Sequence, residues 1–323
     1  MTRDEPLPDY SSLPELPGGG RSGWGLFGAD DNVGMFNLQT PERVTAAARL
    51  VRKGAVFSMN APMDVISPPM FDRKALRRTP IVPAHGRSMD DIFDEFSPQS
   101  SSQWDALSHA AYAPGSFYNG VTTSEILDEG RNAIHHVAER GIAGRAVIVD
   151  LESVYRAEGA DYDPTVPRAV TVEDLSGCLA AQNVQVETGD VLIIHTGFLE
   201  WYRRHDDPAL RERLASRETL QTLGLQRSEA MAEFIWNLHV SAVVTDLPAL
   251  EQWPPTFDYD ENPFGFLHRF IIGQFGISIG EFWDTAALTQ DCRDDGRYEA
   301  FLVSAPLHVH GAAGSPANAI AIK

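Results

Sequence analysis

The sequence predicts an α/β domain, because segments typical of strands alternate with segments that begin like helices. Mostly apolar runs at 146–151, 191–195 and 240–246 predict three strands, and the second of these is apolar on both faces, as in the middle of a sheet. Helix starts are predicted at Thr171 and Ser228, between these runs. Strands that alternate with helices are typical of a sheet covered by helices.

The first part of the chain predicts an arm that leads into this domain. Residues 1–23 are polar and rich in Pro and Gly, so we expect an extended arm there and a single domain at 24–323. Residues 60–87 show no sustained period and predict a long loop that packs over the domain, as loops that cover functional sites do. A weak strand is predicted at 92–96.

One helix and one strand are expected at the start of the domain. Thr40 is a suitable N-cap, and Pro41 after it suits the first turn of a helix. Gly54 would end this helix at its C′ position, and residues 55–59 would form a strand. Further along, Thr171 and Asp174 form a capping pair for a second helix.

Charge and cysteine content restrict the partners and the compartment. The formal charge is −19, from 45 acidic and 26 basic residues, and this charge would repel both nucleic acid and an anionic membrane. Cys178 and Cys292 are far apart, which argues against a disulfide framework and a thiolate zinc site. Without a signal-like start or a long apolar run, a cytoplasmic protein with a small-molecule substrate is expected.

Two short motifs point to other chemistries. Gly18, Gly20 and Gly23 fit GxGxxG, but Pro-rich coil precedes them instead of a strand, so nucleotide binding is not expected. Residues 276–280 fit GxSxG and suggest a serine hydrolase with Ser278 as its nucleophile. A nucleophile elbow needs a strand before the serine and a helix after it, whereas helix-like sequence precedes Ser278.

A third pattern, QxxxQxDxxxH, predicts a metal site. It consists of Gln99, Gln103, Asp105 and His109. In an extended segment residues 103 and 105 point the same way, and residues 105 and 109 share a face if a helix begins there. Taken alone, the pattern also fits a capped helix start with a core histidine.

His268 and Glu281 are the fourth candidate set. His268 lies in a helix-like segment with apolar neighbours, and Glu281 directly follows an apolar strand. A carboxylate at the end of a buried strand is costly unless it is paired or ligates a cation.

Together these segments resemble the cyclase family of metal-dependent hydrolases, which includes kynurenine formamidase, isatin hydrolase and trans-dienelactone hydrolase. The resemblance extends through residues 31–50, 103–120, 268–281 and 314–318, and so over nearly the whole chain. It implies a single α/β domain with a mixed, partly barrel-like sheet flanked by helices, of the swivelling β/β/α type. It also implies a homodimer or a higher homo-oligomer.

The resemblance assigns roles to the candidate residues. The two early histidines of the family signature correspond to Gln99 and Gln103, as in the trans-dienelactone hydrolase branch. The signature aspartate corresponds to Asp105, the acid/base histidine to His109, and the later ligands to His268 and Glu281. A carboxamide binds zinc more weakly than an imidazole. We therefore expect one divalent ion, zinc or alternatively manganese, on residues 105, 268 and 281, with the glutamines as weak ligands or substrate hydrogen-bonders.

The implied activity is hydrolysis of an amide, a cyclic imide or a lactone of a small molecule by metal-activated water, with His109 moving the proton. Trp104 and Tyr118 are expected to contact the substrate, since aromatic walls are typical of such pockets. His195 could face the site or be a core histidine. The alternatives are a metal-free binding protein or pseudoenzyme, a serine hydrolase through Ser278, and an iron oxygenase.

Overall fold

A nine-stranded mixed sheet forms the centre of the protein. The computed structural model describes residues 7–159 and 161–323. The strands are β1 (Val56–Ser58), β4 (Gln103–Asp105), β5 (Ile142–Asp150), β7 (Val191–His195), β9 (Ala242–Thr245), β10 (Ser278–Glu281), β11 (Glu299–Ser304), β12 (Gly314–Pro316) and β13 (Ala319–Ile322). Their order is β1-β13-β11-β5-β7-β9-β10-β4-β12.

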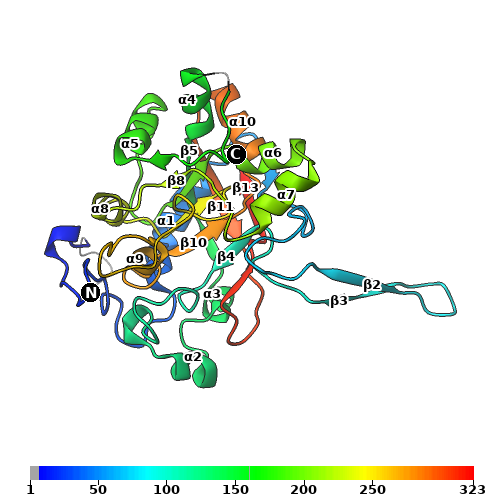
Figure 1. Ribbon diagram of the computed structural model, residues 1–323, viewed down its shortest axis with the longest axis horizontal. Helices are drawn as coiled ribbons and strands as arrows, with labels where there is room; N and C mark the ends of the chain where they lie inside the picture. The colour runs from blue at the N-terminus through cyan, green and yellow to red at the C-terminus, as the bar shows by residue number, and fades with distance from the viewer. Residues whose placement is uncertain (1–6, 160) are drawn as a thin grey trace.

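The middle of this sheet is parallel and its two sides are antiparallel. Strands β5, β7, β9 and β10 run in the same direction, and every other pairing in the sheet is antiparallel. The sheet curls, and helices lie around it (Figure 1). The predicted single α/β domain with a mixed, partly barrel-like sheet is therefore confirmed.

Helices cover both faces of the sheet. They are α1 (Pro41–Ala48), α2 (Thr123–Glu129), α3 (Ile134–Arg140), α4 (Leu151–Glu158), α5 (Val172–Ala181), α6 (Phe198–Arg204), α7 (Pro208–Ala215), α8 (Glu229–Asn237), α9 (His268–Ile271) and α10 (Ala286–Asp295), with short 3-10 helices η1 (Tyr10–Ser12), η2 (Gly34–Leu38) and η3 (Tyr118–Gly120). Because side chains alternate along β5, Val147 and Val149 pack in a cluster that includes residues of helices α4 to α9. Ala146 and Ile148 pack in a second cluster with residues of α3 and α10.

The predicted central strands and helix starts are confirmed. The three apolar runs form β5, β7 and β9. The hydroxyl of Thr171 accepts from the backbone N–H of Asp174, and the Asp174 carboxylate accepts from the N–H of Thr171, which completes a capping box. The Ser228 hydroxyl accepts from the N–H of Met231 at the start of α8.

The first helix begins where expected but ends earlier. Thr40 caps α1 by accepting from the N–H of Arg43, yet the helix stops at Ala48. The N–H groups of residues 49–51 bond to carbonyls three residues back, so the chain tightens and leaves the helix. Gly54 is therefore not its C′ residue, and the predicted end was wrong. Instead, Gly54 lies in the irregular segment just before β1, with a φ of +67°.

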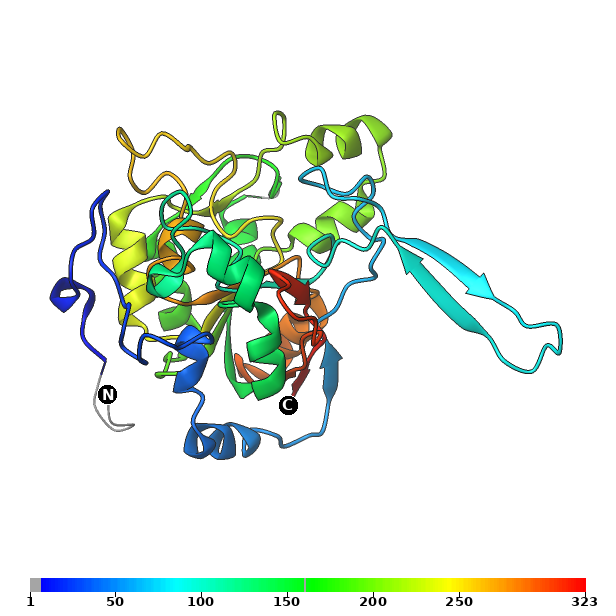
Figure 2. The ribbon, with the colours of Figure 1, turned by 90° about the horizontal axis from the view of Figure 1, so that it is seen from below.

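The segment predicted as a covering loop contains a projecting hairpin. Strands β2 (Arg77–Ile81) and β3 (Asp90–Asp94) pair antiparallel, and every residue of both is exposed. Figures 1 and 2 show this hairpin extending away from the body of the protein. The weak strand predicted at 92–96 corresponds to β3. The expectation that residues 60–87 form only a loop over the domain was wrong.

The arm lies against its own chain. Residues 1–6 of the predicted arm lie outside the described residues. Further along, the backbone N–H of Tyr10 donates to Asn237 Oδ1 (2.7 Å), and Trp236 Nε1 donates to the carbonyl of Pro8 (2.8 Å). A separate two-stranded sheet joins β6 (Ala169–Val170) to β8 (Gly224–Leu225). In the part of the chain that the structure describes, no helix combines the length and apolar character needed to cross a bilayer.

Candidate metal centre

Strand β4 presents two polar side chains to one face of the sheet. It lies between β10 and β12, and its register places Gln103 directly opposite Glu281 and Asp105 opposite Ile279. Since side chains alternate along a strand, Gln103 and Asp105 point to the same face, as the sequence predicted. Glu281 faces the same way from β10, because directly opposed residues share a face.

His268 joins these side chains from α9. Its Nε2 lies 3.2 Å from Glu281 Oε1 and 3.9 Å from Asp105 Oδ2. Its Nδ1 lies 2.7 Å from Oε2 of Glu251. Asp105, Glu251, His268 and Glu281 are all buried. Asp105, His268 and Glu281 each offer one possible metal-ligand atom, and these atoms lie within 4.8 Å of one another. Within residues 7–159 and 161–323, no other set of three or more His, Cys, Asp or Glu side chains does so.

Four buried oxygen atoms around the centre have no hydrogen-bond partner among the described residues. They are both carboxylate oxygens of Asp105, Oε1 of Gln103 and Oε1 of Glu251. Gln103 Nε2 donates to Glu281 Oε2 (2.6 Å), so its Oε1 stays available as an acceptor. Buried acceptors without partners are costly, and a cation would satisfy them. Two carboxylates and one imidazole also suit zinc or manganese, so the residues present fit a divalent ion.

The electrostatics of the centre also favour a cation. Burial raises the pKa of Asp105 above its usual value, although His109 and His268 counteract this. Burial alone would lower the pKa of His268, but Glu251 and Glu281 raise it well above its usual value overall. The neighbouring carboxylates thus stabilise positive charge at this imidazole, and a metal ion would supply that charge in place of a proton.

His109 lies at the edge of the centre. Residues 106–109 form a turn, closed by a bond from the His109 N–H to the Ala106 carbonyl (2.9 Å), so the helix expected there is absent. The turn still brings His109 Nδ1 to 3.5 Å from Asp105 Oδ1 and to 3.4 Å from Gln99 Nε2. Burial lowers the pKa of His109, and Asp105 partly offsets this. Its side chain is 28% exposed, whereas Asp105 is fully buried.

Trp104 and Tyr118, which were expected to contact the substrate, do not point toward the candidate metal ligands. Trp104 points to the opposite face of β4 from its neighbours, is fully buried, and donates from Nε1 to Ser304 Oγ (3.0 Å). Tyr118 is fully buried in the core, and its hydroxyl donates to Asp31 Oδ2 (3.3 Å). An aromatic ring does lie at the centre, because Phe266 stacks on His268 with ring centroids 4.8 Å apart.

Two residues beside the centre were missed from the sequence. Glu251 is fully buried and holds the Nδ1 side of His268. A signal for it existed, since this acid follows the buried segment after β9. Arg73 contacts the carbonyl oxygen of Gln99 through Nη1. No local pattern indicated Arg73, because it lies in a segment without regular structure.

The other candidates lie outside the centre. His195 is buried at the end of β7, with Nδ1 2.7 Å from Thr285 Oγ1 and Nε2 3.1 Å from Glu152 Oε2, as a core histidine would be. Ser278 opens β10, and its side chain faces away from that of Glu281. The chain continues after Ser278 as a strand and not as a helix, so the geometry of a nucleophile elbow is absent there.

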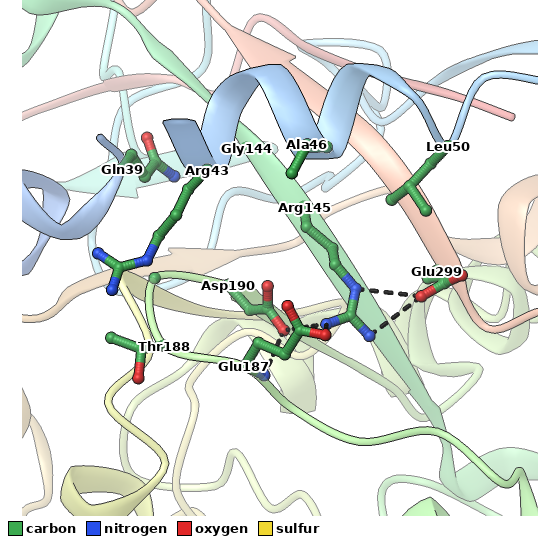
Figure 3. A pocket seen from close by; sticks show the side chains of 12 residues that line it. Gln39, Arg43, Ala46, Leu50, Gly144, Arg145, Glu187, Thr188, Asp190 and Glu299 are labelled. Carbon is green, nitrogen blue, oxygen red and sulfur yellow. Dashed lines mark hydrogen bonds and ion pairs between the residues drawn. The ribbon is translucent and has the colours of Figure 1, made fainter. Parts of the chain in front are cut away.

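A separate cavity of about 560 Å³ lies under α1 (Figure 3). Asp190 precedes β7, whereas Glu281 ends the parallel strand β10, so this cavity and the metal centre lie at opposite ends of the sheet. Burial raises the pKa of Asp190 to about 7. Arg145 lies within ion-pair distance of Asp190 (3.2 Å), Glu187 (3.1 Å) and Glu299 (3.0 Å), so one guanidinium is shared by three carboxyl groups in this cavity.

The chain belongs to the cyclase family. Residues 45–252 match the family model Cyclase, described as "Putative cyclase". A crystal structure described as that of a novel cyclase is 32% identical to this chain, covers 94% of it and 99% of its own length, and superposes with a TM-score of 0.81.

Two more distant structures share the fold. Isatin hydrolase A from Labrenzia aggregata, bound to benzyl benzoate, is 16% identical, with 85% of this chain and 94% of that chain covered and a TM-score of 0.58. Isatin hydrolase A from Ralstonia solanacearum is 18% identical, with 88% and 98% covered and a TM-score of 0.57. No curated protein matches the chain.

Proposed function

We propose that this protein is a metal-dependent hydrolase that opens an amide, a cyclic imide or a lactone of a small molecule. The observation that carries the proposal is the buried set Asp105, His268 and Glu281, in which both oxygens of Asp105 lack a hydrogen-bond partner. The proposal is also supported by the two isatin hydrolases that share the fold.

Residues Asp105, His268 and Glu281 would hold one divalent ion, zinc or alternatively manganese. Such an ion activates water and polarises a carbonyl group. Gln103 orients Glu281 through its amide N–H and offers Oε1 as a weak ligand or as a substrate hydrogen-bonder. Glu251 accepts from Nδ1 of His268 and so holds the ring with Nε2 on the side of Asp105 and Glu281, where it would be free to bind the ion.

His109 would move the proton in this reaction. Its side chain is 28% exposed, whereas those of Asp105, His268 and Glu281 are buried, so water and substrate can reach it. As a general base it accepts a proton from the attacking water, and as a general acid it returns that proton to the leaving nitrogen or oxygen.

Metal analysis followed by an activity screen tests the proposal. We expect about one zinc or manganese ion per chain. We also expect hydrolysis of a member of a panel of lactones, formamides and cyclic imides, with the activity lost after chelation and restored by the ion. Asp105→Asn should lose both the ion and the activity, whereas Asp128→Asn, at an exposed position on α2, should keep both.

Activity that survives complete removal of metal would contradict the proposal. Labelling of Ser278 by a fluorophosphonate, together with activity that is insensitive to chelator, would instead support a serine hydrolase.

A further inference from the structure

A guanidinium group lies beside the candidate metal centre without a carboxylate to pair with. Arg73 is partly buried, in the segment between β1 and β2. Among the described residues, its side chain makes one hydrogen bond, to the carbonyl of Gln99, and has no carboxylate oxygen within 4.0 Å. Charged groups withdrawn from water are normally paired, so this group is a candidate for binding an anion.

The backbone before Arg73 has an unusual conformation. Phe71 and Asp72 adopt left-handed φ angles of +63° and +61°, although neither is a glycine. Such conformations are costly and concentrate at functional sites. The Arg73 guanidinium carbon also lies 5.1 Å from the centroid of the Phe71 ring, and Phe71 packs against Trp253 with ring centroids 5.0 Å apart. The contacts with an aromatic ring and a carbonyl restrict the guanidinium to one place.

The negative charges that act on Arg73 are those of the metal centre, and Arg217 is the positive one. Desolvation lowers its pKa, and Asp105 and Glu281 oppose this effect. A divalent ion bound between these two carboxylates would cancel their two negative charges. The third carboxylate of the centre, Glu251, contacts the Nδ1 side of the His268 ring, away from Asp105 and Glu281. With the ion in place, Arg73 therefore keeps a positive charge that the carboxylates facing it no longer balance.

The neighbouring arginine is already paired. Arg217 Nε lies 3.1 Å from Asp72 Oδ2, and its side chain is 55% exposed. Arg217 and Arg73 lie at the same aromatic ring, with their guanidinium carbons 5.5 and 5.1 Å from the centroid of Phe71. Of these two arginines, Arg73 is the one without a carboxylate partner among the described residues.

We propose that Arg73 binds a carboxylate of the substrate, so that the enzyme selects carbonyl compounds that carry an anionic group near the bond to be cleaved. This inference rests on the proposed function. A guanidinium has five N–H donors in a planar fork that matches a carboxylate, and Arg73 uses one of them here. Arg73 lies more than 4.0 Å from the carboxylate oxygens of the candidate metal ligands. We therefore expect it to bind an anionic substituent of the substrate and not the carbonyl group that reacts at the ion.

Calorimetric titration of the zinc-loaded full chain with benzoate and with benzamide tests this role. These two probes share a ring and a carbonyl group but differ in charge. We expect wild type to prefer benzoate, and Arg73→Gln to weaken benzoate binding about 10- to 100-fold while benzamide binding is unchanged. Arg73→Lys should bind benzoate with intermediate affinity, because it keeps the charge but loses the fork.

The matched control is Arg78→Gln on the exposed hairpin, where the arginine pairs with Asp91, and this variant should bind both probes as wild type does. Zinc content, measured on every sample, separates the two proposals. If Arg73→Gln holds zinc and still binds benzoate like wild type, the inference is wrong and the proposed hydrolase is unaffected. A wild-type protein that takes up no zinc would contradict both.

Discussion

Gln103 shows how one side chain can serve a metal centre in two ways. Its amide nitrogen donates to Glu281 across the strand pair β4–β10, while its buried oxygen has no partner. A carboxamide is both donor and acceptor, so Gln103 can hold Glu281 in position and still offer its oxygen to an ion bound there. We therefore expect that glutamine at this position is compatible with metal binding, although it is a weaker ligand than histidine.

His109 can be tested separately from the metal ligands. We expect His109→Ala to lower kcat about 10²- to 10⁴-fold, because the proton transfer loses its general acid/base. The ion should remain, since Asp105, His268 and Glu281 are unchanged. Steady-state kinetics and elemental analysis of the same sample measure both effects. His205→Ala, at an exposed position beyond α6, is the control. Normal turnover in His109→Ala would exclude this role.

At the scale of elements, the sequence predicts the parts of the site but not how they meet. Alternation along β4 placed Gln103 and Asp105 on one face, and that was confirmed. The pairing of Gln103 with Glu281 joins residues 178 positions apart, and no local pattern encodes such a register. Strand β2 was missed because all of its residues are exposed, so no alternation of burial marks it.

The contact between α3 and the loop after β11 should be sensitive to pH. The His135 ring lies 4.0 Å from that of His136 and 4.6 Å from that of His310, measured between centroids. Burial lowers the pKa of His135, and the charges of His136 and His310 lower it further. The unfolded chain therefore takes up this proton more readily than the folded one. Stability should fall as the pH drops through about 6.5, the usual pKa of histidine.

Urea unfolding at pH 7.5 and at pH 5.5 measures this effect. We expect the free energy of unfolding to be lower at the acidic pH, and His135→Gln to reduce the difference. His85→Gln, on the exposed hairpin, should leave it unchanged. An equal pH dependence in wild type and His135→Gln would show that His135 does not contribute.

At the scale of the whole molecule, the contacts within a single chain do not explain what stabilises the projecting hairpin β2–β3. An isolated two-stranded hairpin is marginally stable in water, yet β2–β3 projects from the body with Ile92 47% and Phe93 57% exposed. We expect another copy of the chain to cover it in a homodimer or a higher homo-oligomer, since exposed apolar side chains at one place are typical of contact surfaces.

Charged substitutions on the hairpin test this expectation. Replacing Ile92 and Phe93 together by Asp should shift the molecular mass, measured by light scattering after gel filtration, toward that of the monomer. Leu127→Asp is the control, because Leu127 is 77% exposed on α2, away from the hairpin. A monomeric wild type, or a double variant with the wild-type mass, would contradict the expectation.

The overall class of the fold could be predicted, whereas its closure could not. The alternation of the runs that became β5, β7 and β9 with helices predicts an α/β sheet. The partly barrel-like form was implied by the family resemblance alone. Antiparallel strands added from distant parts of the chain produce it, and their short, locally unremarkable sequences do not specify their neighbours.

The position of β13 in the sheet has a consequence for the rate of folding. It separates β1 from β11 and is the sheet partner of β1, with Val56 paired to Ile322. Bringing such distant segments together has a large loop-closure entropy, so β1 should dock late and the domain should fold slowly. The carboxylates of Asp105 and Glu281 likewise come together only when β4 pairs with β10, which is distant in the sequence. An ion bound by these side chains would thus stabilise the finished domain and not guide its first steps.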